Sequence, residues 1–426
     1  MVNSTKHMSN GAIAKANYDL FPELATTLLY FIEKFHEALV KQGVDQVYFL
    51  SREGQPLKRM FDMYQIRVSG TIASHYLEVS RRSTLLPSLA PLVDETFETL
   101  FRQYRRISLV EFLSSLGLEA QAQSLAKALG LPDGAEHRRE EDFPTSRTFS
   151  ALRATPQFQT LYESERVARR NAFIAYLSEL SGGTLPSRLV VVDVGWKGTI
   201  QDNLFYLLCR NNESPVDTVT GYYVGLVAEG AAGPGNEKYG LLFSSVGGLS
   251  PGFRVFNENR ALFEVVLAAD HGSIVSYAST PDGSARAVRG EFEEREMLAA
   301  EVFPVQRHIF THYERLLATM RSSGMSRSLT LEETVRAHAR MVFDPTPQER
   351  SWFSSVFHVE NYGVFERSHF ATPETRPGLF ERLCFLAQLL RRNDPGALGF
   401  WPWSTIYQRG GALPAAIYAA VRRIQN

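Results

Sequence analysis

The chain has 426 residues, a length that predicts two or three domains of ordinary size. Its 45 Lys and Arg residues balance 46 Asp and Glu residues, and the formal net charge of -1 excludes the strongly basic composition of a general nucleic-acid binder. A hydrophobic share of 44% is typical of a globular protein. The two cysteines, Cys209 and Cys384, are too few for a disulfide framework and favour a reducing compartment.

Neither end of the sequence indicates export or a membrane span. Residues 1–16 lack the basic and apolar regions of a secretory signal, so we expect a cytoplasmic protein. No window of the chain approaches the roughly 20 apolar residues that a membrane span needs. The segment Leu413–Ile424, which contains Arg422 and Arg423, suits a packed terminal helix or peripheral contact with the inner face of an anionic cytoplasmic membrane.

The first third of the chain begins with α/β elements. Residues 24–41 carry apolar side chains at helical spacing and predict an amphipathic helix that ends at Gly43. The β-branched and aromatic run 44–50 predicts a strand, and a polar loop leads from it into a helical pattern. Residues 72–79 predict a second strand.

A long helical region separates these elements from a second α/β part. Residues 92–183 are helical in pattern apart from the charged loop 130–144, and we interpret them as a helical insertion or cap. The continuous apolar run 188–194 is typical of a strand buried on both faces of a parallel sheet. A helix over 200–209 and a strand over 218–227 complete a βαβ unit, which predicts parallel pairing.

The remaining sequence is predicted to be loops and helices. We expect loops over 228–239 and 281–289, with a short helix over 261–269 between them. Helical patterns follow over 291–320, 331–357 and 377–426. The predicted fold class is therefore α/β, with a parallel Rossmann-like sheet, a helical insertion and a mostly helical C-terminal region. The predicted divisions are 17–91, 92–183, 184–280 and 290–426.

Three of the predicted strands end in a polar loop that carries a cation. These cations are Arg52, the pair Arg81 and Arg82, and Lys197. Because the carboxyl ends of parallel strands lie along one edge, where ligands bind, we expect the cations to converge on a phosphate site. The alternative for each of them is a solvated or salt-bridged loop residue.

The segment after the third strand strengthens the phosphate hypothesis. Its two glycines, one of them Gly198, permit close backbone approach, and the following helix offers its N-terminal N–H groups to an anion. Lys197 and Thr199 add a charge and a hydroxyl. The spacing matches neither a Walker A loop nor a dinucleotide-binding glycine motif.

Carboxylates and one histidine are the candidate catalytic groups. Asp193 and Glu53, at the ends of neighbouring strands, could hold a metal ion or remove a proton, or could simply pair with nearby cations. His271 follows an apolar helix that contains Glu264, but a lone histidine is more often structural. The histidines show no metal-ligand spacing, and no Gly-x-Ser-x-Gly or His-Glu-x-x-His motif is present.

Several segments resemble a module of bacterial polysaccharide-biosynthesis proteins that often follows a haloacid-dehalogenase-like domain. These segments are Tyr48–Gly54, Tyr76–Arg82, Val192–Gln201, Gly221–Leu226 and Glu264 with Gly272, Ser273 and Tyr277. Their order and spacing match from about Phe21 to Trp403. In such proteins the module is the glycan phosphoribosyltransferase part of ribofuranosyltransferases. It moves 5-phosphoribose from phosphoribosyl diphosphate to a sugar hydroxyl, and a phosphatase later removes the 5-phosphate.

The resemblance implies a role for each candidate residue. The donor phosphates would contact Arg52, Arg81, Arg82, Lys197, Gly198 and Thr199. Asp193 or Glu53 would act as the base or hold a metal ion, for which Mg²⁺ is the candidate. The substrate would contact Tyr76, Trp196, Gln201, Glu264 and His271, although a tryptophan after a strand is equally expected in a core.

Two departures from the family pattern leave alternatives open. The usual Ser-Arg-Asp-Gly is Ser51–Gly54 here, with Glu53 in place of the aspartate, which lengthens the carboxylate arm. The sequence also lacks the phosphatase domain, so we expect a separate phosphatase, another sugar diphosphate donor, or no catalysis. The competing hypotheses are a phosphatase or hydrolase acting on sugar phosphates and a non-catalytic partner in a polysaccharide assembly complex. For the transferase, the acceptor would be a capsule or O-antigen glycan, lipid-linked or free.

Overall fold

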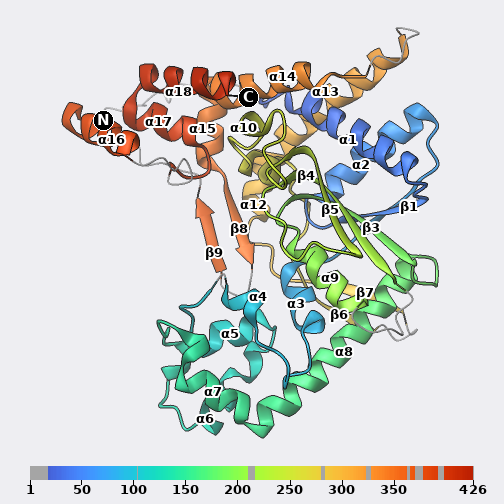
Figure 1. Cartoon of the computed structure of the whole chain (residues 1–426), viewed down its shortest axis with the longest axis vertical. Coiled ribbons are helices and arrows are strands. Elements are labelled where there is room, and N and C mark those ends of the chain that lie inside the picture. The colour runs from blue at the N-terminus through green and yellow to red at the C-terminus, as the bar shows by residue number, and fades with distance from the viewer. Residues whose placement is uncertain are drawn as a thin grey trace, which may run out of the picture.

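A five-stranded parallel sheet forms the centre of the molecule, in the order β2-β1-β3-β4-β5 (Figure 1). The structure is a computed structural model that describes residues 18–102, 104–209, 216–279, 284–322, 328–361, 365–369, 378–391 and 398–425. The strands are β1 (Gln46–Leu50), β2 (Ala73–Leu77), β3 (Arg188–Trp196), β4 (Thr218–Leu226) and β5 (Asn236–Ser244). The predicted α/β class with a parallel Rossmann-like sheet is confirmed.

Both faces of the sheet are covered. Successive side chains of a strand point to opposite faces, so Val47 and Phe49 of β1 pack with α1 (Leu24–Lys41) and α2 (Gly54–Val68). Tyr48 and Leu50 point the other way and pack with α8 (Pro156–Leu180) and α9 (Thr199–Cys209). Burial on both faces explains why β1 and β3 are continuous apolar runs in the sequence.

The strand order fixes where a ligand is expected. The order 2-1-3-4-5 is one of the two common arrangements of doubly wound sheets, and its topological switch point lies between β1 and β3. Ligands of such sheets bind in the crevice outside the carboxyl ends of the strands at that point. The loop that follows β1 and the end of β3 therefore flank the position where a ligand is expected.

Two predicted loops are wrong in part. The predicted loop 228–239 overlaps β5, which begins at Asn236, and the predicted loop 281–289 contains β7 (Ala285–Arg289), the partner of β6 (Ile274–Ser279). β5 is an edge strand with several exposed or half-buried residues, so it lacks the continuous apolar run of the central strands. β7 is likewise polar and only partly buried, because the β6-β7 ribbon has a single buried face.

The helical insertion has a hydrophobic core of its own. It contains α4 (Glu98–Phe101), α5 (Leu109–Ser115), α6 (Ala122–Ala128), α7 (Arg147–Ala154) and the first half of α8. Phe112 lies at its centre, and its ring is 5.2 Å from that of Phe97 and 5.3 Å from that of Phe149. The second half of α8 leaves this cluster and packs on the sheet through Phe173 and Leu177. The insertion is therefore tied to the sheet by one continuous helix.

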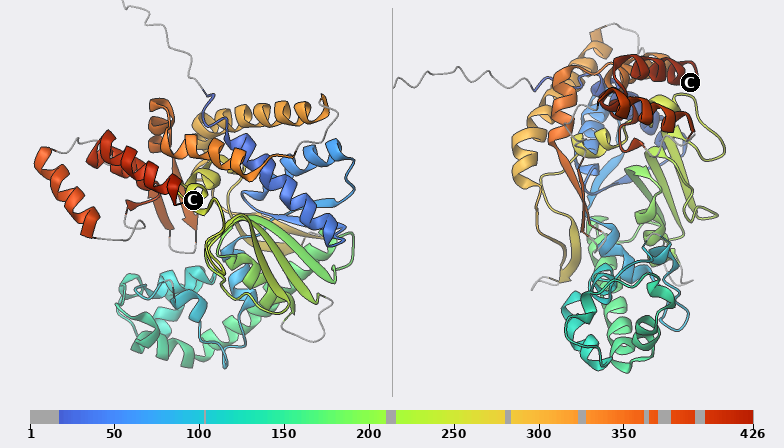
Figure 2. Two further views of the ribbon diagram at one scale, coloured as in Figure 1. Left: turned by 45° about the horizontal axis from the view of Figure 1, so that its top comes forward. Right: turned by 90° about the vertical axis from the view of Figure 1, so that its left-hand side faces the viewer.

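The C-terminal region is mostly helical and packs in the same core as the sheet. Its elements are α10 (Phe253–Phe256), α11 (Ala261–Val266), α12 (Arg295–Met297), a π-helical turn (Leu298–Val302), α13 (Phe303–Ser322), α14 (Leu331–Phe343), α15 (Pro347–Ser355), β8 (Phe357–Asn361), β9 (Phe365–His369), α16 (Leu379–Arg391), α17 (Pro402–Gly410) and α18 (Ala412–Ile424). The β8-β9 hairpin lies between the C-terminal helices and the helical insertion, which occupy opposite ends of the molecule (Figure 2). Within the described residues, no helix combines the length and the apolar character that a membrane crossing requires.

Candidate functional site at the sheet edge

Asp193 is the central group of the candidate site. It lies within β3, where it pairs with Tyr223 of β4, and its Oδ1 atom accepts a hydrogen bond of 2.8 Å from the backbone N–H of Val194. Burial raises the pKa of Asp193 well above its usual value, and the negative charge of Glu53 raises it further. Its pKa is also raised by Glu264 and lowered by Arg81, so these three side chains act on one carboxyl group.

A strongly raised carboxyl pKa is a property that functional sites often show. A carboxyl group with a raised pKa accepts a proton more readily near neutral pH than an ordinary aspartate does. Glu53 is close enough for its negative charge to act on the Asp193 carboxyl, whereas the catalytic role of the two residues stays a prediction. Glu264, which the sequence predicted as a substrate contact, is the third member of this cluster of acidic side chains.

The carboxylates suit a magnesium ion only in combination with a substrate. Among the described residues, no set of three or more His, Cys, Asp or Glu side chains is arranged to hold a metal ion. Mg²⁺ usually takes one or two protein carboxylates and completes its octahedron with water and substrate phosphates. Asp193 and Glu53 offer such oxygen ligands, and their mutual repulsion is what a cation would relieve.

Trp196 ends β3 and is held between an acid and a cation. Its indole N–H donates a hydrogen bond to the Glu264 carboxylate, and the guanidinium of Arg260 lies 5.3 Å from its ring centroid. Its ring also packs 5.8 Å from that of Phe243. The Trp196 side chain is half-buried. Its hydrogen bond positions the carboxylate of Glu264. Sequence reasoning missed Arg260, although its position four residues before Glu264 is a usable signal.

Tyr76 and His271 come together from distant parts of the chain. The Tyr76 hydroxyl lies 2.7 Å from Nε2 of His271, and Nδ1 of His271 lies 2.8 Å from the carbonyl oxygen of Gly272. A carbonyl only accepts hydrogen bonds, so Nδ1 carries the proton and Nε2 accepts from Tyr76. Burial lowers the pKa of His271 and raises that of Tyr76, which keeps both groups neutral. The sequence predicted both residues as substrate contacts but did not predict their contact with each other.

Arg52 does not point freely at the sheet edge as predicted. Its Nη1 atom lies 2.5 Å from Oε2 of Glu294, and the two side chains are only 10% and 4% exposed. The guanidinium is therefore neutralised by a buried carboxylate, which weakens its assignment to donor phosphate. Glu294 was missed because the run Glu291–Arg295 has the composition of a solvated surface segment.

The pair Arg81 and Arg82 divides between two places. Both residues lie in the first turn of α3 (Arg81–Ser88), not in the predicted loop, because Ser80 caps this helix through the backbone N–H of Ser83. Arg81 acts on Asp193, whereas Arg82 forms an ion pair with Glu119 of the helical insertion. Arg82 thus ties the insertion to the sheet, and Arg81 is the cation that faces the carboxylates.

The turn from β3 to α9 keeps Lys197 exposed on a rigid backbone. Gly198 has a φ of +65°, and a Cβ atom there would lie 2.7 Å from the Tyr223 hydroxyl oxygen. At Gly195 a Cβ atom would overlap the carbonyl oxygen of Gly225. The two glycines are therefore required by packing against β4 rather than by approach to a ligand. The carbonyl oxygen of Lys197 accepts a 3.0 Å hydrogen bond from Nζ of Lys238, which anchors the backbone of this turn to β5.

Thr199 begins α9 and is half-buried, so its predicted place at a helix N-terminus is confirmed. The prediction that Gln201 contacts substrate is wrong. Gln201 is fully buried, and its amide nitrogen donates to Asn236 Oδ1 at 2.7 Å. Its amide oxygen accepts from the Tyr223 hydroxyl at 2.7 Å. The side chain is saturated by protein groups and joins α9 to β4 and β5.

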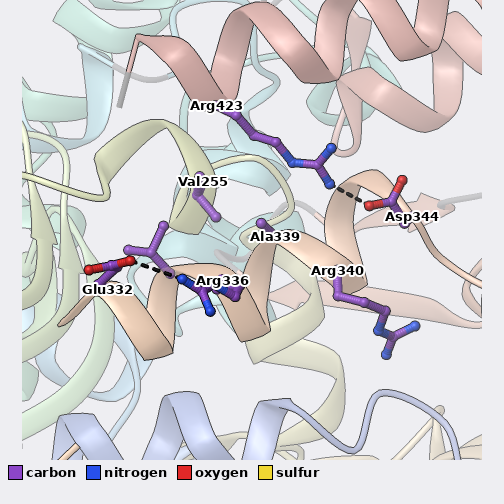
Figure 3. A pocket seen from close by; sticks show the side chains of 8 residues that line it. Val255, Glu332, Arg336, Ala339, Arg340, Asp344 and Arg423 are labelled. Atoms are coloured by element: carbon purple, nitrogen blue, oxygen red, sulfur yellow. Dashed lines mark hydrogen bonds and ion pairs between the residues drawn. The ribbon is translucent and has the colours of Figure 1, made fainter. Parts of the chain in front are cut away.

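Two cavities lie near the C-terminal helices. The first, of about 470 Å³, lies between α10, α14 and α18, and Figure 3 shows its charged side chains. Each of its arginines is engaged: Arg336 with Glu332, Arg423 with Asp344, and Arg340 with Glu23 and Glu349. The second, of about 310 Å³, lies between the α10-α11 turn and residues 399–402.

No protein-family model matches the chain, and a search among curated proteins found no match either.

Proposed function

We propose that the chain is a glycosyltransferase of bacterial surface polysaccharide biosynthesis. It would transfer a 5-phosphoribosyl group from phosphoribosyl diphosphate to a hydroxyl of a capsule or O-antigen glycan. The observation that carries the proposal is the electrostatic grouping of Asp193 with Glu53, Glu264 and Arg81 at the switch point of the sheet. A base flanked by a cation and a helix N-terminus is what transfer from a sugar diphosphate requires.

In the proposed reaction, Asp193 accepts the proton of the acceptor hydroxyl. The hydroxyl oxygen forms a bond to the anomeric carbon of the donor while the bond from that carbon to the diphosphate oxygen breaks. The diphosphate leaves with the electron pair, and the developing negative charge is stabilised by Lys197, Arg81 and the N-terminal N–H groups of α9. The exposed position of Lys197 leaves its ammonium group accessible to a phosphate.

A magnesium ion would be held by the carboxylates of Asp193 and Glu53 and would add charge neutralisation at the diphosphate. The longer arm of Glu53, compared with the aspartate of the resembling family, extends its reach toward the donor. Two contacts between protein groups do not depend on the ion: Trp196 orients Glu264, and the Tyr76 hydroxyl holds the ring of His271.

A hydrolase acting on sugar phosphates is the second candidate. A base such as Asp193 activates water as well as a sugar hydroxyl, so the same geometry supports hydrolysis when no acceptor is bound. A non-catalytic role in a polysaccharide assembly complex is the third. The three candidates differ in what they do with phosphoribosyl diphosphate.

The experiment uses radiolabelled phosphoribosyl diphosphate with a panel of synthetic and lipid-linked acceptor glycans. Transfer of label to a glycan supports the proposal, release of phosphate without an acceptor supports the hydrolase, and absence of both with no donor binding in calorimetry supports the non-catalytic role. Lys197→Ala is expected to weaken donor binding roughly tenfold, as for a lost hydrogen bond to a charged group. Lys127→Ala, which removes another exposed lysine far from the sheet edge, is the matched control.

We further propose that the protein acts at the inner face of the cytoplasmic membrane, which it would contact through α18. Leu413, Ile417, Val421 and Ile424 form an apolar stripe along α18 and are 44% to 84% exposed. Arg422 and Arg423 bind Tyr418 and Asp344 instead, so the stripe and not these cations would contact lipid. Such contact would place the protein at the surface where lipid-linked acceptors lie.

A further inference from the structure

The cavity of about 310 Å³ joins the sheet core to the C-terminal helices. Its lining residues come from the turn between α10 and α11, from the segment that precedes α17, and from α18. They are Asn257, Glu258, Arg260, Ala261, Gly399, Phe400, Pro402 and Arg422. The volume is at the lower end of the range for small-molecule sites. Half-exposed Phe400 offers an aromatic surface, to which the C–H face of a sugar ring is suited.

Unpartnered polar atoms are concentrated beside this cavity. Oδ1 of Asn257 is buried and has no hydrogen-bond partner within the described part of the chain. The same holds for both amide atoms of fully buried Asn259, in the same turn, and for Nε1 of Trp403. Buried polar groups are normally satisfied, so these atoms are unusual. Of the three residues, Asn257 lines the cavity itself.

The lining of the cavity carries two arginines, Arg260 and Arg422, and one carboxylate, that of Glu258. The guanidinium of Arg260 lies 5.3 Å from the centroid of the Trp196 ring, and the negative charge of Glu264 also acts on it. Burial lowers the pKa of Arg260, and the negative charge of Glu264 partly offsets this effect. Glu258 is already used: it accepts hydrogen bonds from Trp403 N at 2.8 Å and Tyr418 Oη at 2.9 Å. Burial raises its pKa to about 8, while Arg422, whose Nε atom lies 3.8 Å from Oε2 of Glu258, lowers it.

Arg260 connects this cavity to the candidate catalytic group. The guanidinium of Arg260 packs on the Trp196 ring, and the indole N–H of Trp196 donates a hydrogen bond to Glu264. Glu264 is close enough to Asp193 to raise the pKa of that residue. A ligand bound to Arg260 would therefore be connected to the proposed base, Asp193, through Trp196 and Glu264.

We propose that this cavity is a subsite for a negatively charged sugar unit, a hexose that carries a carboxylate or a phosphate. Arg260 would bind the anionic group, and the side-chain amide of Asn257, which lines the cavity, would contact a sugar hydroxyl. Assigning the bound unit to the acceptor glycan rests on the proposed function; the presence of the subsite does not.

The test measures binding of three probes to the full chain by calorimetry: methyl glucuronoside, glucose 6-phosphate and uncharged methyl glucoside. The charged probes are expected to bind more tightly than the uncharged one, and their relative affinity separates a carboxylate from a phosphate subsite. Arg260→Met is expected to weaken binding of the charged probes roughly tenfold or more. Arg336→Met, at an exposed arginine of the neighbouring cavity, is the control and should bind as the wild type does.

Equal affinity of the wild type for charged and uncharged probes would overturn the proposal, as would wild-type affinity in the Arg260→Met variant. If that variant unfolds, Asn257→Ala serves instead, because it removes an amide that has an unpartnered oxygen. Phosphoribosyl diphosphate is titrated separately. Sugar binding that depends on Arg260 without donor binding would contradict the proposed function alone, and donor binding without sugar binding would contradict the subsite alone.

Discussion

Arg52 and Glu294, 242 positions apart in the chain, form a buried ion pair with a distance of 2.5 Å between Nη1 and Oε2. The pair joins the turn after β1 to the segment that leads into α12. Because both side chains are largely withdrawn from water, the loss of one partner leaves the other as a buried charge with fewer compensating contacts.

We therefore expect Arg52→Ala to lower the free energy of unfolding by about 3 to 5 kcal/mol, measured by urea denaturation. Glu294→Gln should be destabilising in the same direction. The double variant Arg52→Met/Glu294→Met should recover much of the loss, since a buried ion pair can be replaced by apolar groups at little cost. Near-wild-type stability of Arg52→Ala would instead return Arg52 to the group of candidate phosphate ligands.

Asp193→Asn should raise stability and remove activity together. Unfolded Asp193 ionises near its ordinary pKa of 3.8, whereas its pKa in the folded protein is raised well above that value. The wild type thus loses stability as pH rises from about 3.8 toward the folded pKa, by about 1.4 kcal/mol for each unit of the shift. The variant does not titrate, so its advantage should grow over the same window.

Denaturation of Asp193→Asn and wild type at a series of pH values checks this expectation. Asp94→Asn, at an exposed aspartate, should leave the unfolding free energy unchanged. An Asp193→Asn variant that is less stable than wild type at neutral pH would contradict the expected direction, and one that retains transfer would remove Asp193 from the role of base.

Tyr76→Phe should destabilise the protein through its buried histidine. The substitution removes the hydroxyl that donates to His271 Nε2, and a buried acceptor without a donor costs about 1 to 3 kcal/mol. The loss is measured as the free energy of unfolding. Tyr239→Phe, which removes a hydroxyl bonded to exposed Glu237, should change stability by less than about 0.5 kcal/mol. Equal effects of the two substitutions would mean that the Tyr76–His271 contact adds nothing to stability.

The apolar stripe of α18 can be tested with vesicles. We expect the protein to sediment with vesicles that contain phosphatidylglycerol, and Ile417→Glu to reduce the bound fraction severalfold because it places a charge within the stripe. Val93→Glu makes the same change at an exposed apolar residue of the helical insertion and should bind as the wild type does. Binding that is indifferent to Ile417→Glu would argue against contact through this helix.

Much of the α/β core was predictable because its signals are local. The helix over 24–41 was predicted with the bounds that the structure gives it, and the run 188–194 identified β3, because apolar periodicity and continuous burial leave direct traces in a sequence. The polar residues after β1 and β3 could be placed at one edge by the rule for parallel strands. Edge strand β5 escaped detection because its partial exposure removes that trace.

The sequence by itself predicted that β3 and β4 are parallel and that Glu53 and Asp193 lie at the carboxyl ends of strands along one edge. Tertiary structure decided which candidate side chains remain available to bind a ligand at that edge. Gln201 is buried, and Arg52 and Arg82 form ion pairs with Glu294 and Glu119. Arg260, which the sequence did not single out, packs on Trp196. The physical reason is that periodicity reports which face of an element is buried. The partner of a charged side chain depends on packing between segments up to hundreds of residues apart, which no local pattern records.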